Sequence, residues 1–354
     1  MKILITGAFG NVGMSTVTEL MNSEHTIRIF DRLTRKNKRL ADRLVLRLPK
    51  NRRNQLEIQL GNLLHISDVF DAVKGVDRVI HLAAVIPPEA DQNPEAAELV
   101  NVEGTRMLIR AMEKSGRNPH LLFASSVALY GDRLNSPYIK PSDPPHPNPD
   151  DVYARHKVAC EQLLRNSTLP WSIFRLSYIA DSGRLKLDPL MFEMPLATSL
   201  EICDTKDAGL AFAKGVQSEE IWGKVLLIAG GETCRIEYRD YLKEMFSIMG
   251  LGREEIPEAA FCSCNFHCGF LDTRLSQKLL QYQKHTLADF FAEVKKKYAW
   301  RRRFIYPVIN LVRKLLFLRS SRYVLFLQTK IGQDLSRSAL YVKYLFSRGS
   351  MSPA

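Results

Sequence analysis

Short apolar runs alternate with helix-like segments through residues 1–230, and this alternation limits the possible folds more than any other feature. Several runs are apolar almost throughout, as strands buried on both faces must be. Strand–helix alternation implies right-handed crossovers, so the sequence predicts an α/β fold with a doubly wound parallel sheet. The predicted strands are KILITG, HTIRIFD, QLEIQLG, VDRVIHLAA, HLLFASS, WSIFRLS and GKVLLIAGG, and the predicted helices lie near 11–23, 67–74, 95–116, 151–166 and 206–218.

A glycine-rich turn joins the first predicted strand to the first predicted helix. Gly7 permits a tight turn, Gly10 leaves room for a pyrophosphate near the backbone, and Gly13 lets the helix pack closely on the strand. The start of the helix then offers free N–H groups and a partial positive charge to phosphates. In this context the glycines indicate a Rossmann-like dinucleotide-binding unit, the alternative being a structural βαβ unit with chance glycines.

Asp31 ends the second predicted strand, and its residue type indicates which nucleotide this unit prefers. A carboxylate at this position accepts hydrogen bonds from the adenosine ribose and repels a 2′-phosphate, which favours NAD over NADP. Arg32 and Arg35 oppose that preference, because either side chain can reach a phosphate.

Tyr153 and Lys157 lie four residues apart on one predicted helix and therefore share a face. A tyrosine with a pKa near ~10 is a poor base at neutral pH, but a nearby cation favours its phenolate form. Tyr153 can then exchange a proton with a substrate hydroxyl while a hydride leaves the same carbon. Ser126 ends another predicted strand, at the edge of the sheet where a hydroxyl can polarise a substrate oxygen.

Together these motifs resemble the NAD-dependent epimerase/dehydratase family, the extended short-chain dehydrogenases/reductases. The resemblance runs from residue 1 to about 297, and it implies an NAD-dependent enzyme with Ser126, Tyr153 and Lys157 as its catalytic triad. It also implies a homodimer formed through two long helices. It rests on Thr6-Gly7-x-x-Gly10-x-x-Gly13, Asp31, Gly61-Asn62-Leu63, His81-Leu82-Ala83-Ala84, Asn101-Val102-Glu103-Gly104-Thr105, Ser125-Ser126-Val127-Ala128-Leu129-Tyr130-Gly131, Tyr153-x-x-x-Lys157 and Arg175.

The glycine turn, Asp31 and the resemblance together predict two sets of contact residues. The resemblance implies that Asn62 lies near the adenine, and Asp207 looks like the acidic residue that precedes the family's late helix. The predicted cofactor contacts are Gly7, Phe9, Gly10, Asn11, Val12, Gly13, Asp31, Arg32, Asn62, Leu63, Leu82, Ala83, Ala84, Asn101, Tyr153 and Lys157. The predicted substrate contacts are Ser126, His146, Arg175 and Tyr178.

Three departures from the family pattern bear on the substrate. Asn62 replaces the usual aspartate at the adenine amine, although its side-chain oxygen can still accept that hydrogen bond. Tyr178 replaces an asparagine that many nucleotide-sugar enzymes carry, and the segment 175–207 is short and lacks the usual arginine. Val127 and Ala128 follow Ser126 where a dehydratase has an Asp-Glu pair, so dehydration by that route is disfavoured.

Cysteine and histidine usage predicts neither a disulfide framework nor a metal site. The six cysteines suit free thiols in a reducing compartment, and no signal-peptide pattern follows Met1, so we expect a cytoplasmic protein. Cys262-x-Cys264-x-x-His267-Cys268 contains soft ligands, but its spacing fits no common zinc finger. His81 is predicted to be structural.

The net charge of +12 comes mainly from the end of the chain. After Tyr298 the only acidic residue is Asp334, whereas the basic residues are Arg301, Arg302, Arg303, Arg313, Lys314, Arg319, Arg322, Lys330, Arg337, Lys343 and Arg348. The charge is thus a property of the tail and does not indicate nucleic-acid binding. We expect three parts: a dinucleotide-binding domain (1–230), a small, mostly helical substrate-binding lobe (231–297) and a basic amphipathic helical extension (298–354).

The extension carries an amphipathic pattern that predicts a helix. Ile305, Val308, Ile309, Val312, Leu315 and Leu316 form its apolar face, and Asn310, Arg313 and Lys314 avoid the centre of that face. Pro307 falls in the predicted first turn. Two interpretations stay open: peripheral contact with an anionic membrane through 301–330, or docking on the protein itself.

Three functional hypotheses follow. The first is an NAD-dependent oxidoreductase or epimerase acting on a secondary alcohol or ketone of a sugar or sugar nucleotide. The second keeps the chemistry but takes a lipid-like or sterol-like alcohol at a membrane surface. The third is a non-catalytic, NAD-sensing binding protein, which has no need of the acid/base group at Tyr153.

Overall fold

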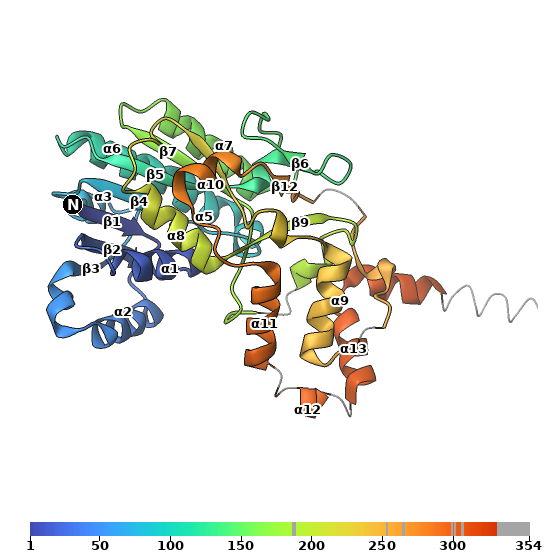
Figure 1. Cartoon of the computed structure of the whole chain (residues 1–354). Helices are drawn as coiled ribbons and strands as arrows, with labels where there is room; N and C mark the ends of the chain where they lie inside the picture. The colour runs from blue at the N-terminus through green and yellow to red at the C-terminus, as the bar shows by residue number, and fades with distance from the viewer. Residues whose placement is uncertain are drawn as a thin grey trace, which may run out of the picture.

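A seven-stranded parallel sheet forms the centre of the N-terminal domain in the computed structural model (Figure 1). The structure describes residues 1–185, 189–252, 254–263, 266–298, 300, 302–305 and 308–330. All pairings in this sheet are parallel. In spatial order the strands are β10 (Val225–Ile228), β7 (Trp171–Leu176), β5 (His120–Ser126), β4 (Arg78–His81), β1 (Lys2–Thr6), β2 (Thr26–Arg32) and β3 (Leu56–Gly61). The sequence prediction of these seven strands and of a Rossmann-like sheet is confirmed.

Helices cover both faces of the sheet because its strands are apolar on both sides. In β1, Ile3 and Ile5 enter one hydrophobic core while Leu4 enters the other. The first core lies under α1 (Asn11–Leu20) and α8 (Thr205–Gly215), and the second under α3 (Ile66–Val73), α6 (Gly104–Lys114) and α7 (Val152–Arg165). The strand order reverses between β1 and β4, so a crevice for ligands is expected at their carboxyl ends.

Two helical segments differ from the sequence prediction. Helix α2 (Arg35–Arg47) was not predicted because it buries only Ala41, so it lacks a strong apolar stripe. Thr34 caps it by accepting a hydrogen bond from the Asn37 amide at 3.0 Å. The helix predicted over 95–116 is divided into α5 (Pro94–Glu98), a π-helical turn (Leu99–Glu103) and α6, and α4 (Glu89–Gln92) precedes them.

A smaller lobe packs beside the carboxyl ends of the strands (Figure 1). Its helices are α9 (Tyr238–Met249) and α11 (Leu287–Tyr298), with α10 (Arg274–Leu280) between them in the chain. Two small sheets accompany it: β8 (Tyr178–Ala180), β9 (Ser199–Asp204) and β11 (Arg235–Glu237) form one, and β6 (Tyr138–Ile139) and β12 (Phe270–Leu271) the other. The lobe has its own core, to which α9 contributes Tyr238, Leu242 and Phe246.

Residues predicted to form a separate extension pack into this lobe. Helix α12 (Arg302–Ile305) is followed by α13 (Ile309–Phe317), and Leu316 and Phe317 belong to the lobe core. Arg313, predicted to avoid the centre of the apolar face, is buried against the lobe, and its guanidinium donates to the carbonyls of Leu251 (2.8 Å) and Glu255 (2.9 Å). Arg301, Pro307 and 331–354 lie outside the described residues.

No helix within the described part of the chain has both the length and the hydropathy needed to cross a bilayer. Helix α13, for example, has 9 residues.

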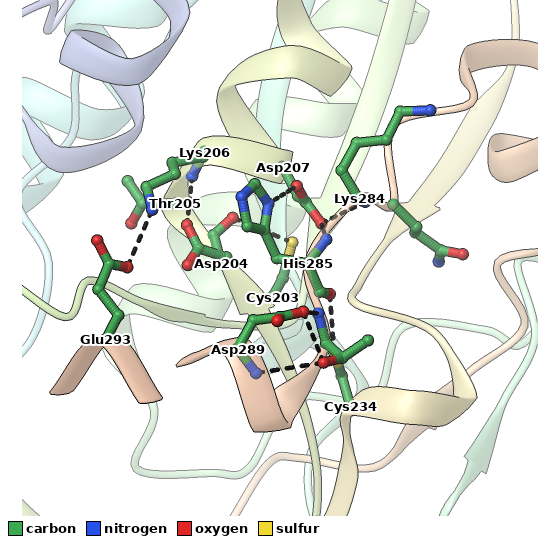
Figure 2. Close-up of polar contacts among 12 residues, drawn as sticks. Cys203, Asp204, Thr205, Lys206, Asp207, Cys234, Lys284, His285, Asp289 and Glu293 are labelled. Atoms are coloured by element: carbon green, nitrogen blue, oxygen red, sulfur yellow. Dashed lines mark hydrogen bonds and ion pairs between the residues drawn. The ribbon is translucent and has the colours of Figure 1, made fainter. Parts of the chain in front are cut away.

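Polar contacts tie α8 to the chain segment that leads into α11 (Figure 2). The buried carboxylate of Asp207 accepts hydrogen bonds from the backbone amides of Lys284 (2.9 Å) and His285 (3.0 Å), and it lies 2.6 Å from His285 Nδ1. Lys206 donates to Glu293 of α11 at 2.9 Å. Asp207, which the family resemblance marks as the acidic residue before the late helix, thus fixes the lobe against the dinucleotide-binding domain.

Candidate active site

The glycine turn between β1 and α1 leaves open space above the backbone. At Gly7, where φ is +68°, an added Cβ would lie 2.6 Å from the Ala83 amide nitrogen, so this residue must be glycine for the turn to contact the end of β4. At Gly10 an added Cβ would meet only the Gly7 carbonyl oxygen, at 3.2 Å. That single contact would be tight, but the rest of the space at Gly10 is open, so its missing side chain leaves room for a ligand. No side chain caps α1 there, so its first amides remain available to phosphates.

A cavity of about 240 Å³ opens from this turn along the ends of β2, β3 and β4. At its edge, the Asp31 carboxylate accepts hydrogen bonds from the Phe9 amide (2.8 Å) and the Asn37 side chain (3.0 Å). The Arg32 amide also donates to it at 2.7 Å, and since a carboxylate has about four lone-pair sites, Asp31 can still accept from a ribose hydroxyl. The cavity is lined by Gly7, Phe9, Gly10, Phe30, Asp31, Arg32, Lys36, Asn37, Gly61, Asn62, Leu63, Leu82, Ala83, Ala84, Val85 and Val100.

Ten of the predicted cofactor contacts line this cavity. Asn11, Val12, Gly13 and Asn101 lie outside its lining. Asn11 lines a neighbouring apolar pocket, Val12 packs against the core, and Gly13 is buried where α1 meets the turn. Asn101 is 3% exposed, and its amide pairs with the backbone N–H and carbonyl of Val85 at 2.7 and 2.9 Å. The Asn101 side chain thus holds Val85, a residue of the cavity wall, in place, and its direct contact with the cofactor stays a prediction.

Ser126 and Tyr153 face a second cavity, of about 650 Å³. Lys157 lies one helical turn beyond Tyr153 on α7 and is 4% exposed. Its ammonium donates to the Ala124 carbonyl at 2.6 Å and lies 5.5 Å from the centre of the Tyr153 ring. The structure therefore brings the three predicted catalytic residues together at the end of β5, with Lys157 beneath the other two.

Burial changes the proton affinities of this group. Burial and the nearby Asp151 carboxylate raise the pKa of Tyr153 above its ordinary value, and a hydrogen bond with Ser126 opposes them. Burial also lowers the pKa of Lys157 to about 8. At neutral pH Tyr153 is thus a protonated phenol, and Lys157 carries most of its positive charge.

Asp151 starts helix α7 and so sets the position of Tyr153. Its Oδ1 accepts a hydrogen bond from the Ala154 amide at 2.8 Å, which is an N-cap. Its Oδ2 lies 3.0 Å from His267 Nδ1. His267 lines the catalytic cavity, so a residue of the lobe is connected directly to the start of the catalytic helix.

Arg175, predicted to contact substrate, is buried in an ion pair behind the cavity. The guanidinium donates to both carboxylate oxygens of Glu161, at 2.9 and 2.7 Å, and to the Tyr130 hydroxyl at 2.6 Å. Ser125 donates to the same carboxylate at 2.6 Å, whereas Ser126 faces the cavity. Only 3% of Arg175 is exposed. The prediction of a substrate contact is therefore corrected: Arg175 pairs with the only nearby acid on α7 and supports that helix against β5 and β7.

Tyr178 and His146, the other two residues predicted to contact substrate, lie in different places relative to the catalytic cavity. Tyr178 lines both the catalytic cavity and the neighbouring apolar pocket. His146 is exposed on the proline-rich loop over residues 137–149 and is not among the residues that line the catalytic cavity. Its backbone amide donates to the Leu129 carbonyl at 2.7 Å, so this position holds the loop in place.

Three polar residues near the cavities were missed by sequence reasoning. Arg184 hydrogen-bonds the Asn11 side chain at the glycine turn and supplies a cation in the segment that seemed to lack one. Arg322, from the basic tail, lines the catalytic cavity and lies 3.6 Å from Glu193. His267 was considered only as a metal ligand. Their contacts join segments far apart in the chain, which no local pattern encodes.

The described residues contain no cluster of three or more histidine, cysteine or acidic side chains arranged to hold a metal ion. Cys264, part of the motif considered for zinc, lies outside the described residues. His267 and Cys268 from the same motif both line the catalytic cavity.

Comparison with known proteins gives consistent matches. Residues 3–178 match the NAD dependent epimerase/dehydratase family. A UDP-glucose 4-epimerase from Pisum sativum is 30% identical over 200 residues, which cover 53% of this chain and 56% of that protein. A 3-beta-hydroxysteroid dehydrogenase from Mycolicibacterium neoaurum is 28% identical over 170 residues, covering 46% and 42%. The chain thus spans about half the length of these relatives.

Solved structures share the fold over a larger part of the chain. A dTDP-glucose 4,6-dehydratase from Streptomyces venezuelae, solved with NAD, has a TM-score of 0.69 at 20% identity, covering 86% of this chain and 98% of that one. A UDP-glucuronic acid 4-epimerase from Bacillus cereus has a TM-score of 0.67 at 18% identity, covering 86% and 100%. Residues 3–178, about half of the chain, therefore belong to the NAD-dependent epimerase/dehydratase family.

Proposed function

We propose that this protein is an NAD-dependent oxidoreductase or epimerase that acts on a secondary alcohol or ketone of a sugar or sugar nucleotide. The observation that carries the proposal is the position of Ser126 and Tyr153 on one cavity wall with the Lys157 ammonium buried 5.5 Å from the Tyr153 ring. A binding protein has no need of this arrangement, which argues against the NAD-sensing alternative.

NAD is the cofactor that the first cavity fits. The open space at Gly10, the uncapped start of α1 and the remaining acceptor capacity of Asp31 suit a pyrophosphate and an adenosine ribose. When bound, NAD supplies a nicotinamide that accepts or returns a hydride. Arg32 and Lys36 also line this cavity and can tolerate a 2′-phosphate, but the Asp31 carboxylate repels one.

The chain's own residues handle the proton and orient the substrate. Ser126 hydrogen-bonds the substrate oxygen, and the Tyr153 hydroxyl gives a proton to that oxygen or takes one from it. Because burial raises the pKa of Tyr153, its action as a base depends on positive charge near the phenol. Lys157 supplies part of that charge from its fixed position on the Ala124 carbonyl.

The relatives support a sugar nucleotide as substrate, since those with UDP-glucose 4-epimerase activity match about half of the chain. A second candidate is a lipid-like or sterol-like alcohol. The wall of the catalytic cavity favours it, because that wall includes the apolar side chains of Ile86, Pro87, Val127, Ile179, Leu190 and Phe266. The similarity to a 3-beta-hydroxysteroid dehydrogenase gives further support. We further propose a cytoplasmic, homodimeric enzyme.

Identification of the nucleotide released when the purified protein is denatured tests this proposal. Stoichiometric NAD or NADH supports a cofactor retained through the reaction, as an epimerase requires, and directs the substrate screen to UDP-sugars. An empty site that binds added NAD reversibly supports a dehydrogenase, and the screen then includes sterol alcohols. Failure to bind either NAD or NADP contradicts the proposal.

A further inference from the structure

Helix α13 is apolar on two opposite faces, and only one of them is covered. The covered face carries Arg313, Leu316 and Phe317, each 5–7% exposed, which pack in the lobe against α9 and the segment that follows it. Ser320 continues this face and donates to the Ala260 carbonyl at 2.6 Å. These contacts fix how the helix is rotated about its axis.

The uncovered face is a stripe of four aliphatic residues. Val308, Leu311, Leu315 and Leu318 are 45%, 57%, 57% and 38% exposed. Their spacing of three, four and three residues places them on one side of a helix. With about 100° between successive residues of α13, Leu311 and Leu315 lie on the side opposite Arg313. The stripe is therefore left exposed by the way α13 docks.

Other exposed apolar side chains flank the stripe in the chain. Trp300 and Phe304, which are 62% and 69% exposed, precede it and contact each other with ring centroids 6.1 Å apart. Leu325 and Phe326 follow it and are 65% and 45% exposed. In Figure 1, α12 lies at the outer end of the lobe, beside the ends of α11 and α13. So many large apolar side chains in one short segment mark an interaction surface.

The charged side chains beside this apolar surface are mostly basic, and the acidic Glu254 pairs with Arg313 of the covered face at 3.3 Å. Lys314 is exposed and lies beside the stripe on α13, and Arg319 is exposed two residues after the helix ends. Lys295 and Lys296 are exposed at the end of α11. From Tyr298 to Gly332 the sequence contains no acidic residue. Any partner of this surface must therefore combine an apolar interior with negative charge at its boundary.

We propose that this surface, formed by Trp300, Phe304, Val308, Leu311, Leu315 and Leu318 with the surrounding lysines and arginines, binds the face of a bilayer that contains anionic lipids. The aliphatic stripe enters the boundary between headgroups and acyl chains, while the cations contact lipid phosphates and carboxylates. A second copy of the chain is disfavoured as the partner, because it would present the same positive charge. With 9 residues α13 is too short to span a bilayer, so it lies along the surface.

Co-flotation of the full-length protein with lipid vesicles tests the proposal. We expect binding to vesicles of phosphatidylcholine with phosphatidylserine, little binding to phosphatidylcholine alone, and release by high salt. Leu311→Ser combined with Leu315→Ser should lower the partition coefficient about tenfold, since two apolar contacts are lost. The matched control, Leu46→Ser with Ile66→Ser, changes two residues of similar exposure (74% and 48%) on α2 and α3 and should bind like the wild type.

A charge variant keeps the test independent of the leucine substitutions. Lys296→Gln combined with Lys314→Gln should weaken binding to phosphatidylserine vesicles at least fivefold, since one cation near an anionic surface contributes about that factor. Circular dichroism and urea unfolding of each variant verify that it is folded. Wild-type binding by the L311S/L315S variant would overturn the proposal. So would a dimer in analytical ultracentrifugation that this variant dissociates without any change in vesicle binding, because the stripe would then be covered by a second copy.

Discussion

Glu161 and Arg175 form a doubly hydrogen-bonded ion pair directly behind the catalytic cavity, with donor–acceptor distances of 2.9 and 2.7 Å. Both side chains are almost fully buried, at 4% and 3% exposure. Glu161 lies on α7, which carries Tyr153 and Lys157, and Arg175 lies on β7. The pair therefore connects the catalytic helix to the central sheet.

Removing one partner of this pair should strongly destabilise the fold. Arg175→Met leaves a buried carboxylate without its partner, and we expect a loss of about 3–5 kcal/mol in the free energy of unfolding. The matched control is Arg165→Met: Arg165 also pairs with Glu161, at 3.3 Å, but is 41% exposed, so its loss should cost at most about 1 kcal/mol. Urea unfolding measures both, and equal losses would contradict the importance of the buried pair.

Asp31 should control the choice of nucleotide. Asp31→Asn removes the negative charge that repels a 2′-phosphate, while Arg32 and Lys36 remain at the same cavity. We expect the KM for NAD to rise about tenfold through weaker ribose hydrogen bonds and the KM for NADP to fall. Adding Arg32→Gln should reverse the gain with NADP. Steady-state kinetics with both nucleotides measure this, and an unchanged NAD/NADP ratio in Asp31→Asn would contradict the role given to Asp31.

Lys157 should make stability depend on pH in the alkaline range. Burial lowers its pKa from the ordinary value of 10.5 to about 8, so above pH 8 the folded protein releases a proton that the unfolded chain still holds. The contribution of Lys157 to the free energy of unfolding therefore rises with pH between about 8 and 10. Relative to Lys157→Met, the wild type should gain about 1–2 kcal/mol between pH 7 and 9.5. Urea unfolding at both pH values measures the difference.

The exposed Lys278 provides the control for this measurement. Lys278→Met should show the same pH dependence as the wild type, because an exposed ammonium is solvated in both states. A wild-type pH dependence in the Lys157→Met variant would contradict a buried ammonium beneath Tyr153.

Asp151 should shift the pH dependence of the reaction. Its charge raises the pKa of Tyr153, so Asp151→Asn is expected to move the rising limb of the rate profile for alcohol oxidation to lower pH. Asparagine is also a good N-cap, so α7 should remain intact. Asp150→Asn removes the same charge one residue earlier and serves as the control. Identical pH profiles for the two variants would show that Asp151 does not act on Tyr153.

The cofactor cavity was largely predictable from sequence because local chain geometry creates it. A turn with Gly7, Gly10 and Gly13 between a strand and a helix has few possible shapes, and Asp31 must then lie at the end of the neighbouring strand. Likewise, the four-residue spacing of Tyr153 and Lys157 on a helix already places them on one face. The spacing does not show how deeply each side chain is buried. In the structure Lys157 lies under the cavity, where its ammonium donates a hydrogen bond to the Ala124 carbonyl.

Residues whose position depends on distant segments were not predictable. Arg175 resembles a substrate-binding arginine until its partner Glu161 is known, and that pairing requires the packing of α7 on β7. The position of Arg322 at the catalytic cavity depends on how the tail folds back onto the lobe. The burial of Arg313 was not predictable for a related reason. Helical periodicity does not show that carbonyl groups of another segment accept hydrogen bonds from its guanidinium.

Replacement of Tyr153 by phenylalanine tests the central claim most directly. The change removes only the hydroxyl that exchanges a proton with the substrate, so NAD should bind with nearly unchanged affinity while kcat falls by about 10²–10⁴-fold. Isothermal titration with NAD and turnover with the substrate found in the screen measure the two quantities on the same preparation. Undiminished turnover in Tyr153→Phe, with NAD binding intact, would contradict the assignment of Tyr153 as the acid/base group.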